Sequence, residues 1–202
     1  MEGEYTIKIC LSGDKNVGKS SLIRQFYDKV FEAQSPTIGM ECQTKCFDID
    51  GSKIKIVVWD TSGDQHYKQV FPHYFKGAHG IILAYDITNA STFSTMEEYY
   101  NEIKKICGDS VVVLVVGNKS DLTDKREVSI TKGEKFAIEN RIAFMETSAK
   151  SAHRVEEAFF MVTKGTYLIR NQKANSNRNE KKQFAGVARN ASREKAGCYQ
   201  NR

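Results

Sequence analysis

The sequence predicts an α/β protein, built as a three-layer α/β/α sandwich with a six-stranded, mostly parallel sheet and one antiparallel edge strand. The main observation is a set of short apolar runs, each too short to span a membrane and each separated from the next by a helix-like segment. The runs are residues 80–86, 111–117 and 142–146, and the helix-like segments lie near 91–107, 131–140 and 154–169. Apolar strands that alternate with helices form parallel sheets covered on both faces.

The chain begins with a strand, a glycine-rich loop and a helix. Residues 5–11 form the apolar strand, and the loop over residues 13–20 reads GDKNVGKS. The helix over residues 21–29 is amphipathic, with its apolar side chains on one face. Ligands of such folds bind in the loops that follow the carboxyl ends of the strands, so this loop is a candidate binding site.

Two further strands form a hairpin before the first apolar run. Residues 43–50 and 53–59 alternate between polar and apolar side chains, and Asp50-Gly51 at their junction favours the positive backbone angles of a tight turn. The two strands are therefore antiparallel. We place this pair at the edge of the sheet.

Length and composition favour one compact domain with a tail. The chain has 202 residues, 40% hydrophobic and 27% charged, which excludes a large multidomain protein and a wholly disordered chain. We place the domain at residues 1–170 and a disordered basic tail at 171–202. No apolar run of about 18 residues and no secretory leader occurs. Five scattered cysteines without a CxxC pair fit neither a disulfide framework nor a zinc site, so we expect a cytoplasmic protein with reduced thiols.

The tail carries most of the positive charge. Residues 171–202 hold eight Lys or Arg and two Glu, a net charge of +6, which leaves −1 on the rest of a chain whose total is +5. Its composition, rich in Asn, Ser, Gln and Lys, cannot offset the entropy of ordering. The tail either keeps the protein soluble or binds a negatively charged membrane surface. Nucleic acid is not an expected partner, because the near-neutral domain offers no basic groove.

The loop at residues 13–20 matches the GxxxxGKS pattern of a phosphate-binding loop. Its glycines allow backbone N–H groups to surround a phosphate, Lys19 reaches the outer phosphates and Ser20 ligates Mg²⁺. A plain glycine turn is the alternative interpretation. A second nucleotide-binding motif is therefore needed before this loop is interpreted as a phosphate-binding loop.

Three more motifs follow later strands. Asp60 and Gly63 in WDTSG can hold the water shell of the same Mg²⁺ and offer an N–H to a terminal phosphate, or form an ordinary turn. Asp121 in NKSD can accept two hydrogen bonds from the N1–H and 2-amino group of guanine, or lie in a surface turn. TSAK at residues 147–150 can close over the base with backbone N–H groups.

These four motifs, each at the exit of a predicted strand, resemble those of Ras-superfamily small GTPases over roughly residues 5–170. Within that superfamily the chain is most similar to the Rab family, because of Trp59 in WDTSG and the stretch YFKGAHGIILAYDIT at residues 74–88. The resemblance implies the P-loop GTPase fold, binding of GTP and GDP with Mg²⁺, GTP hydrolysis, and two switch segments that order around the γ-phosphate. It also implies an exchange factor, a GTPase-activating protein and effectors as partners.

The resemblance assigns a role to each matching residue. Thr37 is the threonine that closes on Mg²⁺ in the GTP state, with Ser20 and Asp60 as the other metal ligands, and Phe31 flanks the guanine. The residues implied to hold the phosphates are Asp14, Lys15, Asn16, Val17, Gly18, Lys19, Ser20 and Ser21. Those implied to hold the base are Asn118, Lys119, Asp121, Leu122, Ser148, Ala149 and Lys150. Catalysis is assigned to Lys19, Thr37, Gly63, Asp64 and Gln65.

One departure from the family pattern falls at the hydrolytic step. The glutamine that orients the attacking water is replaced by Asp64, which is shorter and places a negative charge beside the γ-phosphate. We expect slow intrinsic hydrolysis, unless Gln65 substitutes or an activating protein supplies both an arginine and a glutamine. Lys15 either places a cation near the phosphates or points into solvent.

Three functions remain open from the sequence. The first is a Rab-type switch, which the resemblance places in vesicle trafficking, and the second is a scaffold that stays loaded with GTP because Asp64 disables turnover. A phosphotransferase is the third and is disfavoured, because the motifs specify guanine and no acceptor pocket is evident. The single Cys198, fifth from the end, does not match the family's prenylation motifs. We therefore expect only a weak, peripheral attraction of the tail to the cytosolic face of an intracellular membrane.

Overall fold

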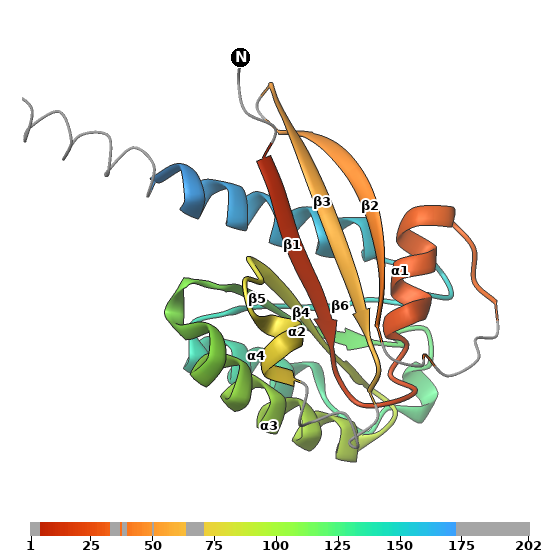
Figure 1. Cartoon of the computed structure of the whole chain (residues 1–202). Helices are drawn as coiled ribbons and strands as arrows, with labels where there is room; N and C mark the ends of the chain where they lie inside the picture. Colours follow the sequence, from red (N-terminus) through yellow and green to blue (C-terminus); the bar gives the residue numbers. More distant parts are fainter. Residues whose placement is uncertain (1–4, 33–36, 38–39, 50, 64–70, 173–202) are drawn as a thin grey trace, which may run out of the picture. The chain divides into compact units, whose positions relative to one another are not determined.

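A computed structural model of the chain describes residues 5–32, 37, 40–49, 51–63 and 71–172 (Figure 1). The chain divides into two compact units, residues 1–166 and 167–202. Every strand of the described residues lies in the first unit. The second is described only over residues 167–172, which are helical, so the predicted tail from residue 173 onward lies outside the described residues.

A six-stranded sheet forms the centre of the first unit, which confirms the predicted fold class. The strand order is β2-β3-β1-β4-β5-β6. The strands are β1 (Tyr5–Ser12), β2 (Met40–Ile49), β3 (Ser52–Thr61), β4 (Gly80–Asp86), β5 (Val112–Asn118) and β6 (Ala143–Glu146). The edge strand β2 runs antiparallel to β3, and all other pairs are parallel. The carboxyl ends of five strands therefore meet at one edge, where ligands of such sheets bind.

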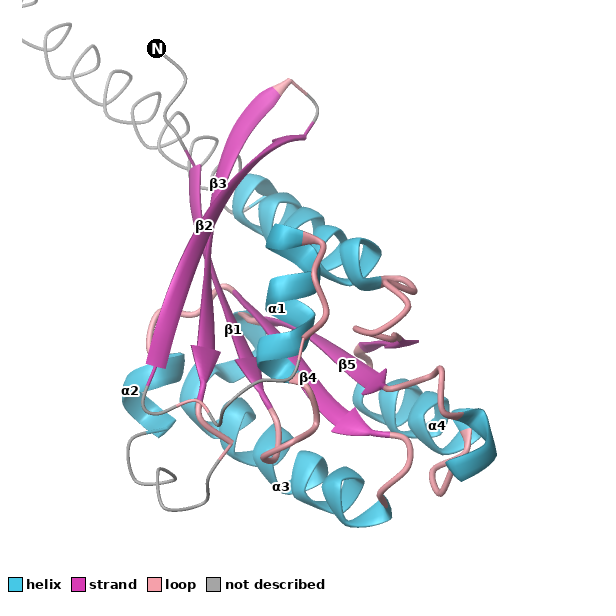
Figure 2. Cartoon of the chain, turned by 90° about the vertical axis from the view of Figure 1, so that its right-hand side faces the viewer, coloured by secondary structure: helices cyan, strands magenta, loops and turns pink. Residues whose placement is uncertain are grey.

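Helices cover both faces of this sheet (Figure 2). In the first unit they are α1 (Lys19–Asp28), α2 (Phe71–Phe75), α3 (Ala90–Cys107), α4 (Ile130–Asn140) and residues 155–166 of a last helix. Single 3-10 turns occur at Gly108–Ser110 and Thr123–Lys125. Asn89 and Ser129 are the N-cap residues that precede α3 and α4, and their side chains accept hydrogen bonds from the backbone N–H groups of Ser91 and Lys132.

The two faces of the sheet have separate apolar cores. On one face, alternate residues of β4, such as Leu83 and Tyr85, join Phe75 of α2 and Phe93 of α3 in a buried cluster, against which α4 also packs. On the other face, Phe26 of α1 stacks on Phe47 of β2 and on Phe159 of the last helix, with ring centroids 5.9 and 4.1 Å apart. Side chains that alternate between two cores explain why the strands are apolar throughout.

The hairpin and the element boundaries refine the predictions. Ile49 pairs with Ser52 and Gly51 has φ 78°, so a two-residue turn joins β2 and β3; Asp50 lies outside the described residues. The strand β3 continues two residues beyond the predicted end, because Asp60 and Thr61 still pair with β2. The short helix α2 was not predicted, since five residues are too few to show a helical period.

Candidate functional site

Two glycines shape the loop between β1 and α1. Gly13 has φ 141°, and a Cβ there would overlap the carbonyl oxygen of Ala84 in β4. Gly18 has φ 97° and directly precedes α1, whose first N–H groups receive no side-chain cap. Such N–H groups carry partial positive charge and bind phosphate. The loop therefore has the strand–loop–helix setting that a phosphate-binding loop requires.

Lys19 is a buried cation at the start of α1. Its side chain is only 5% exposed, and its ammonium group donates hydrogen bonds to the carbonyl oxygens of Gly13 and Asp14, both at 2.8 Å. Burial lowers the pKa of Lys19 to about 8, although the charges of Asp60 and Asp14 oppose this shift. A phosphate placed against this ammonium group would supply the missing negative charge.

The other loop residues divide into structural and exposed ones. The carboxylate of Asp14 accepts hydrogen bonds from the N–H of Lys15 at 2.7 Å and from the hydroxyl of Thr95 in α3 at 3.4 Å. Lys15 and Asn16 are exposed, and Asn16 has φ 63°, which asparagine tolerates. Val17 is fully buried, while Ser21 lies partly buried in α1.

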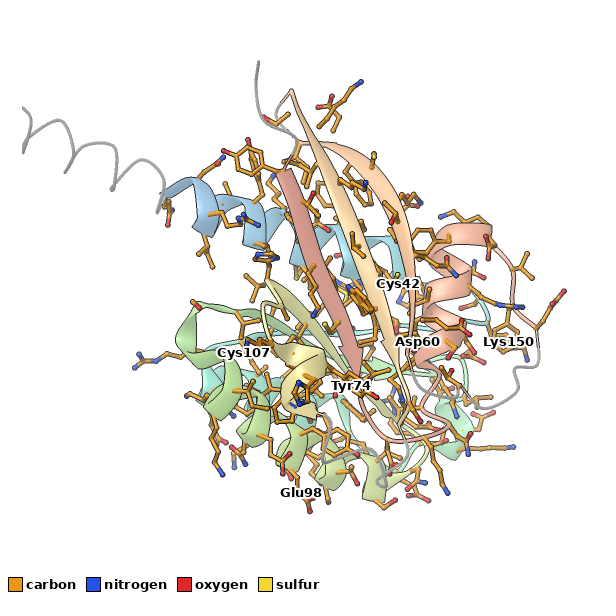
Figure 3. The ribbon with its side chains drawn as sticks, viewed as in Figure 1. Cys42, Asp60, Tyr74, Glu98, Cys107 and Lys150 are labelled. Atoms are coloured by element: carbon orange, nitrogen blue, oxygen red, sulfur yellow. The ribbon has the colours of Figure 1, made fainter. Side chains whose placement is uncertain are left out.

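Three oxygen atoms from distant parts of the chain meet beside Lys19. The Ser20 hydroxyl lies 2.8 Å from the Thr37 hydroxyl and donates to Oδ2 of Asp60 at 2.5 Å, and Thr37 donates to the same oxygen at 3.3 Å. Figure 3 shows Asp60 at the end of β3. The structure thus brings together the three residues predicted as metal ligands.

The chemistry of this oxygen cluster fits Mg²⁺. Oδ1 of Asp60 is buried, and no described residue hydrogen-bonds to it. Burial raises the pKa of Asp60, while hydrogen bonds from Ser20 and Thr37 and the charge of Lys19 lower it. A carboxylate with a buried, unpaired oxygen and two hydroxyl groups form the hard oxygen set that Mg²⁺ prefers. No cluster of three His, Cys, Asp or Glu occurs among the described residues.

Gly63 packs directly on the phosphate-binding loop. A Cβ at this position would lie 2.5 Å from both the carbonyl carbon of Asp14 and the nitrogen of Lys15, and closer still to the ammonium group of Lys19. Glycine is therefore the residue that allows this approach without displacing backbone atoms, and the backbone of Gly63 lies beside the phosphate-binding loop. Asp64 and Gln65 lie outside the described residues, so their predicted roles stay predictions.

Asn118 links the loops after three strands. This residue ends β5 and is 1% exposed. Its amide donates to the carbonyl of Val17 at 2.8 Å, and its Oδ1 accepts from the hydroxyl of Thr147 at 3.2 Å and from the N–H of Ala149 at 3.3 Å. The predicted base-binding motifs are thus joined to each other and to the phosphate-binding loop.

Two further predicted base residues, Lys119 and Asp121, are each held by another side chain. Lys119 has φ 68° and forms an ion pair with Asp86 at 2.6 Å. Asp121 is exposed, and its Oδ1 accepts a hydrogen bond from the buried Ser148 hydroxyl at 2.5 Å. Its carboxylate is therefore held in place at the surface, where a guanine can reach it.

The outer predicted residues are less constrained. Leu122 is partly buried, and Lys150 is exposed on the loop after β6. Phe31 lies in the loop after α1 with 48% of its surface exposed, which leaves its place beside the guanine a prediction.

Sequence reasoning missed two supporting residues. Asp86 ends β4, pairs with Lys119 and accepts hydrogen bonds from the N–H and hydroxyl of Thr88 at 2.9 and 2.7 Å. Thr95 reaches Asp14 from α3. A carboxylate at the exit of an apolar strand, as at Asp60, was the available signal for Asp86; nothing in the sequence pattern marks Thr95.

No helix in the described part of the chain is long and apolar enough to cross a membrane. All four described cysteines, Cys10, Cys42, Cys46 and Cys107, have free thiols, which confirms that part of the prediction.

Comparisons with known proteins agree with this geometry. A model of the Ras family matches residues 8–167. The chain is 39% identical over 173 residues to Ras-related protein Rab-8B of Homo sapiens, with 85% of this chain and 84% of the relative covered. Rab-8B of Pongo abelii and of Bos taurus match with the same identity and coverage. The matched region contains all of the predicted site residues.

Proposed function

The chain belongs to the Ras family and is a Rab-like small GTPase, and from this premise we propose that it is a Rab-type switch that binds GTP and GDP with Mg²⁺ and hydrolyses GTP slowly. One observation carries the proposal. The oxygens of Ser20, Thr37 and Asp60 lie within 3.3 Å of one another, in contact with the loop that holds Lys19. Since these residues come from three separate segments, their convergence supports a shared ligand.

Recognition of the base belongs to the loops after β5 and β6. The carboxylate of Asp121, held by Ser148, accepts the N1–H and 2-amino hydrogens of guanine. Adenine offers no such pair of donors, so this carboxylate selects GTP over ATP. Asn118 fixes the spacing between this pocket and the phosphate-binding loop.

The reaction is in-line attack of water on the γ-phosphorus. A bond forms between the water oxygen and phosphorus, the bond from phosphorus to the bridging oxygen of GDP breaks, and the products are GDP, phosphate and a proton. Lys19 and the N–H groups at the start of α1 stabilise the charge on the outer phosphates. Ser20, Thr37 and Asp60 would hold Mg²⁺, which would supply further positive charge to the oxygens of the outer phosphates. The N–H of Gly63 contacts the γ-phosphate.

Asp64 makes this hydrolysis slow. Its carboxylate is acceptor-only and negative, so it repels the γ-phosphate and cannot orient the water as a glutamine does. The alternative, a scaffold that never hydrolyses GTP, follows if Gln65 does not assist either. Whether the protein is a slow switch or a scaffold, its GTP-bound and GDP-bound forms differ at Thr37 and Gly63, and partner proteins distinguish the two forms there.

The biological setting follows from the family. We place the protein in vesicle trafficking, with an exchange factor, a GTPase-activating protein and effectors that bind the nucleotide-sensitive segments. The basic tail at residues 171–202 gives weak, salt-sensitive binding to an anionic membrane surface on the cytosolic side.

The test is a single-turnover measurement. The protein is loaded with GTP and Mg²⁺, and bound GTP and GDP are quantified over time by chromatography, with Asp64→Gln and Gln65→Ala measured in parallel. We expect Asp64→Gln to hydrolyse GTP at least about tenfold faster than the parent. Equal rates in the parent and Asp64→Gln would contradict the role of Asp64. Failure of the parent to hold any guanine nucleotide would overturn the whole proposal.

A further inference from the structure

The edge strand β6 is held at its carboxyl end by an ion pair with the loop that follows β5. The guanidinium group of Arg126 donates two hydrogen bonds to the carboxylate of Glu146, one to each oxygen, at 2.5 and 2.8 Å. The same group donates to the carbonyl oxygen of Val128 at 3.0 Å. A pair with two parallel hydrogen bonds fixes direction as well as distance, because both groups are planar. We call Arg126 and Glu146 the β6 clasp.

The β6 clasp is sheltered from solvent. Its two side chains are 21% and 13% exposed, whereas those of Arg154 and Glu157, which also form two hydrogen bonds, both at 2.8 Å, are 40% and 49% exposed. Exposed ion pairs contribute little, because water and salt screen them, and partly buried pairs are screened less. The β6 clasp can therefore fix the position of a strand end, and the exposed pair is its natural control.

The strand β6 depends on such support. It has four residues, lies at the edge of the sheet and pairs only with β5. The ends of short edge strands open easily, since few hydrogen bonds hold them. The loop on the other side of the β6 clasp is itself fixed, because the N–H groups of Glu127 and Val128 bond to the carbonyl oxygen of Ile87, after β4, at 2.9 and 3.0 Å. The β6 clasp thus ties the end of β6 to the exit of β4.

The two residues of the β6 clasp belong to the two segments that lead to the proposed guanine site. Arg126 follows Asp121 by five positions, and Glu146 precedes Ser148 by two. The Ser148 hydroxyl donates to the Asp121 carboxylate at 2.5 Å, and a backbone hydrogen bond also joins the two loops. The direction in which the Asp121 carboxylate points therefore depends on where β6 ends.

We propose that Arg126 and Glu146 are positioning residues for guanine recognition, which hold the loop after β6 so that Ser148 keeps the Asp121 carboxylate aimed at the base. The inference deepens the proposed function and rests on it, because it needs a guanine at Asp121. Arg126 and Glu146 act through Ser148 and Asp121, and they leave the phosphate-binding loop unchanged. Loss of the β6 clasp therefore lowers the preference among bases more than the affinity for phosphates.

The test compares GDP with inosine diphosphate, whose base keeps the N1–H of guanine but lacks the 2-amino group. The two nucleotides share every phosphate contact, so the ratio of their affinities reports the hydrogen bond of the 2-amino group. Both are titrated with Mg²⁺ into nucleotide-free protein. The variants are Arg126→Ala, Glu146→Gln and the double variant that combines them. The matched control is Glu157→Gln, which changes the carboxylate of the exposed pair.

We expect the parent to bind GDP at least about tenfold more tightly than inosine diphosphate, because hydrogen bonds to a charged group are strong. Arg126→Ala lowers this ratio at least about threefold. Glu146→Gln keeps one acceptor oxygen and lowers it less, about twofold. Since the two residues act as a pair, the double variant loses no more than Arg126→Ala does. Glu157→Gln keeps the ratio of the parent.

An unchanged ratio in Arg126→Ala and Glu146→Gln would overturn the proposal. So would affinities for GDP and inosine diphosphate that fall by one common factor, which is the result of a merely structural role, or losses that add up in the double variant. If Arg126→Ala does not fold, Glu146→Gln against Glu157→Gln decides. Failure of the proposed function is distinct, because the parent and Glu157→Gln would then bind neither nucleotide, or both equally well.

Discussion

Gly63→Ala is the substitution whose effect is most directly calculable from the structure. The φ of Gly63 lies outside the left-handed region, so alanine causes no backbone strain. Its Cβ, however, would lie 2.5 Å from backbone atoms of Asp14 and Lys15, where ordinary contact begins near 3.4 Å. A shift of about 1 Å is therefore needed, and steric overpacking of this kind costs about 1–3 kcal/mol.

This free-energy cost disfavours the arrangement in which the N–H of residue 63 contacts a γ-phosphate. We expect Gly63→Ala to hydrolyse bound GTP about 5- to 150-fold more slowly, with little change in GDP affinity, because GDP lacks that phosphate. Single-turnover hydrolysis and GDP titration measure the two quantities. Gly165→Ala is the matched control, since its Cβ would lie 3.3 Å from a side-chain methyl group of Val112 and would meet no backbone atom within 4 Å outside its own helix. Unchanged hydrolysis in Gly63→Ala would refute the placement of Gly63 on the loop.

Two further predictions concern the base loops and the buried lysine. Asn118→Ala leaves the hydrogen-bond partners of a buried amide unpaired, so we expect the free energy of unfolding, measured in urea, to fall by about 2–3 kcal/mol. In the control variant Asn140→Ala, on α4, we expect this free energy to change by less than about 1 kcal/mol. Equal losses in the two variants would contradict the bridging role of Asn118. Burial lowers the pKa of Lys19 to about 8 in the free protein, and a bound phosphate raises this pKa again. We therefore expect GTP affinity to be nearly constant below about pH 7 and to fall about tenfold from pH 7 to 9, as titration calorimetry would detect. An affinity that rises over this range would contradict the role of Lys19.

The architecture was predictable because the sheet is encoded locally. The runs at 80–86 and 111–117 are apolar on both faces, which only a sheet covered by two helix layers explains. The hairpin was predictable from Asp50-Gly51. The helix α2 was not, since its single turn is held by contacts with β1 and α3 and not by its own periodicity.

The site was predictable to the extent that motifs encode it. Lys19, Ser20 and Asp60 follow strands within recognisable spacings, and the structure brings them together. Asp86 was marked only by its place at the exit of an apolar strand, and its ion pair with Lys119 depends on the fold. Thr95 acts through a contact with Asp14, far away in sequence, which no local pattern reveals. The cysteines illustrate the same limit. Free thiols were expected from the cysteine spacing, and the four described cysteines have them, but the hydrogen bonds of Cys10 and Cys107 to α2 depend on the fold.

Nucleotide selectivity tests the central claim most directly. The purified protein is stripped of nucleotide, and the binding of GDP, GTP and ATP is titrated with Mg²⁺ and again with EDTA. The account predicts one guanine nucleotide bound per chain, weaker binding in EDTA because the oxygens of Ser20, Thr37 and Asp60 lose their shared cation, and no displacement by a thousandfold excess of ATP. ATP binding as tight as that of GTP, or guanine nucleotide binding that is indifferent to Mg²⁺, would contradict it.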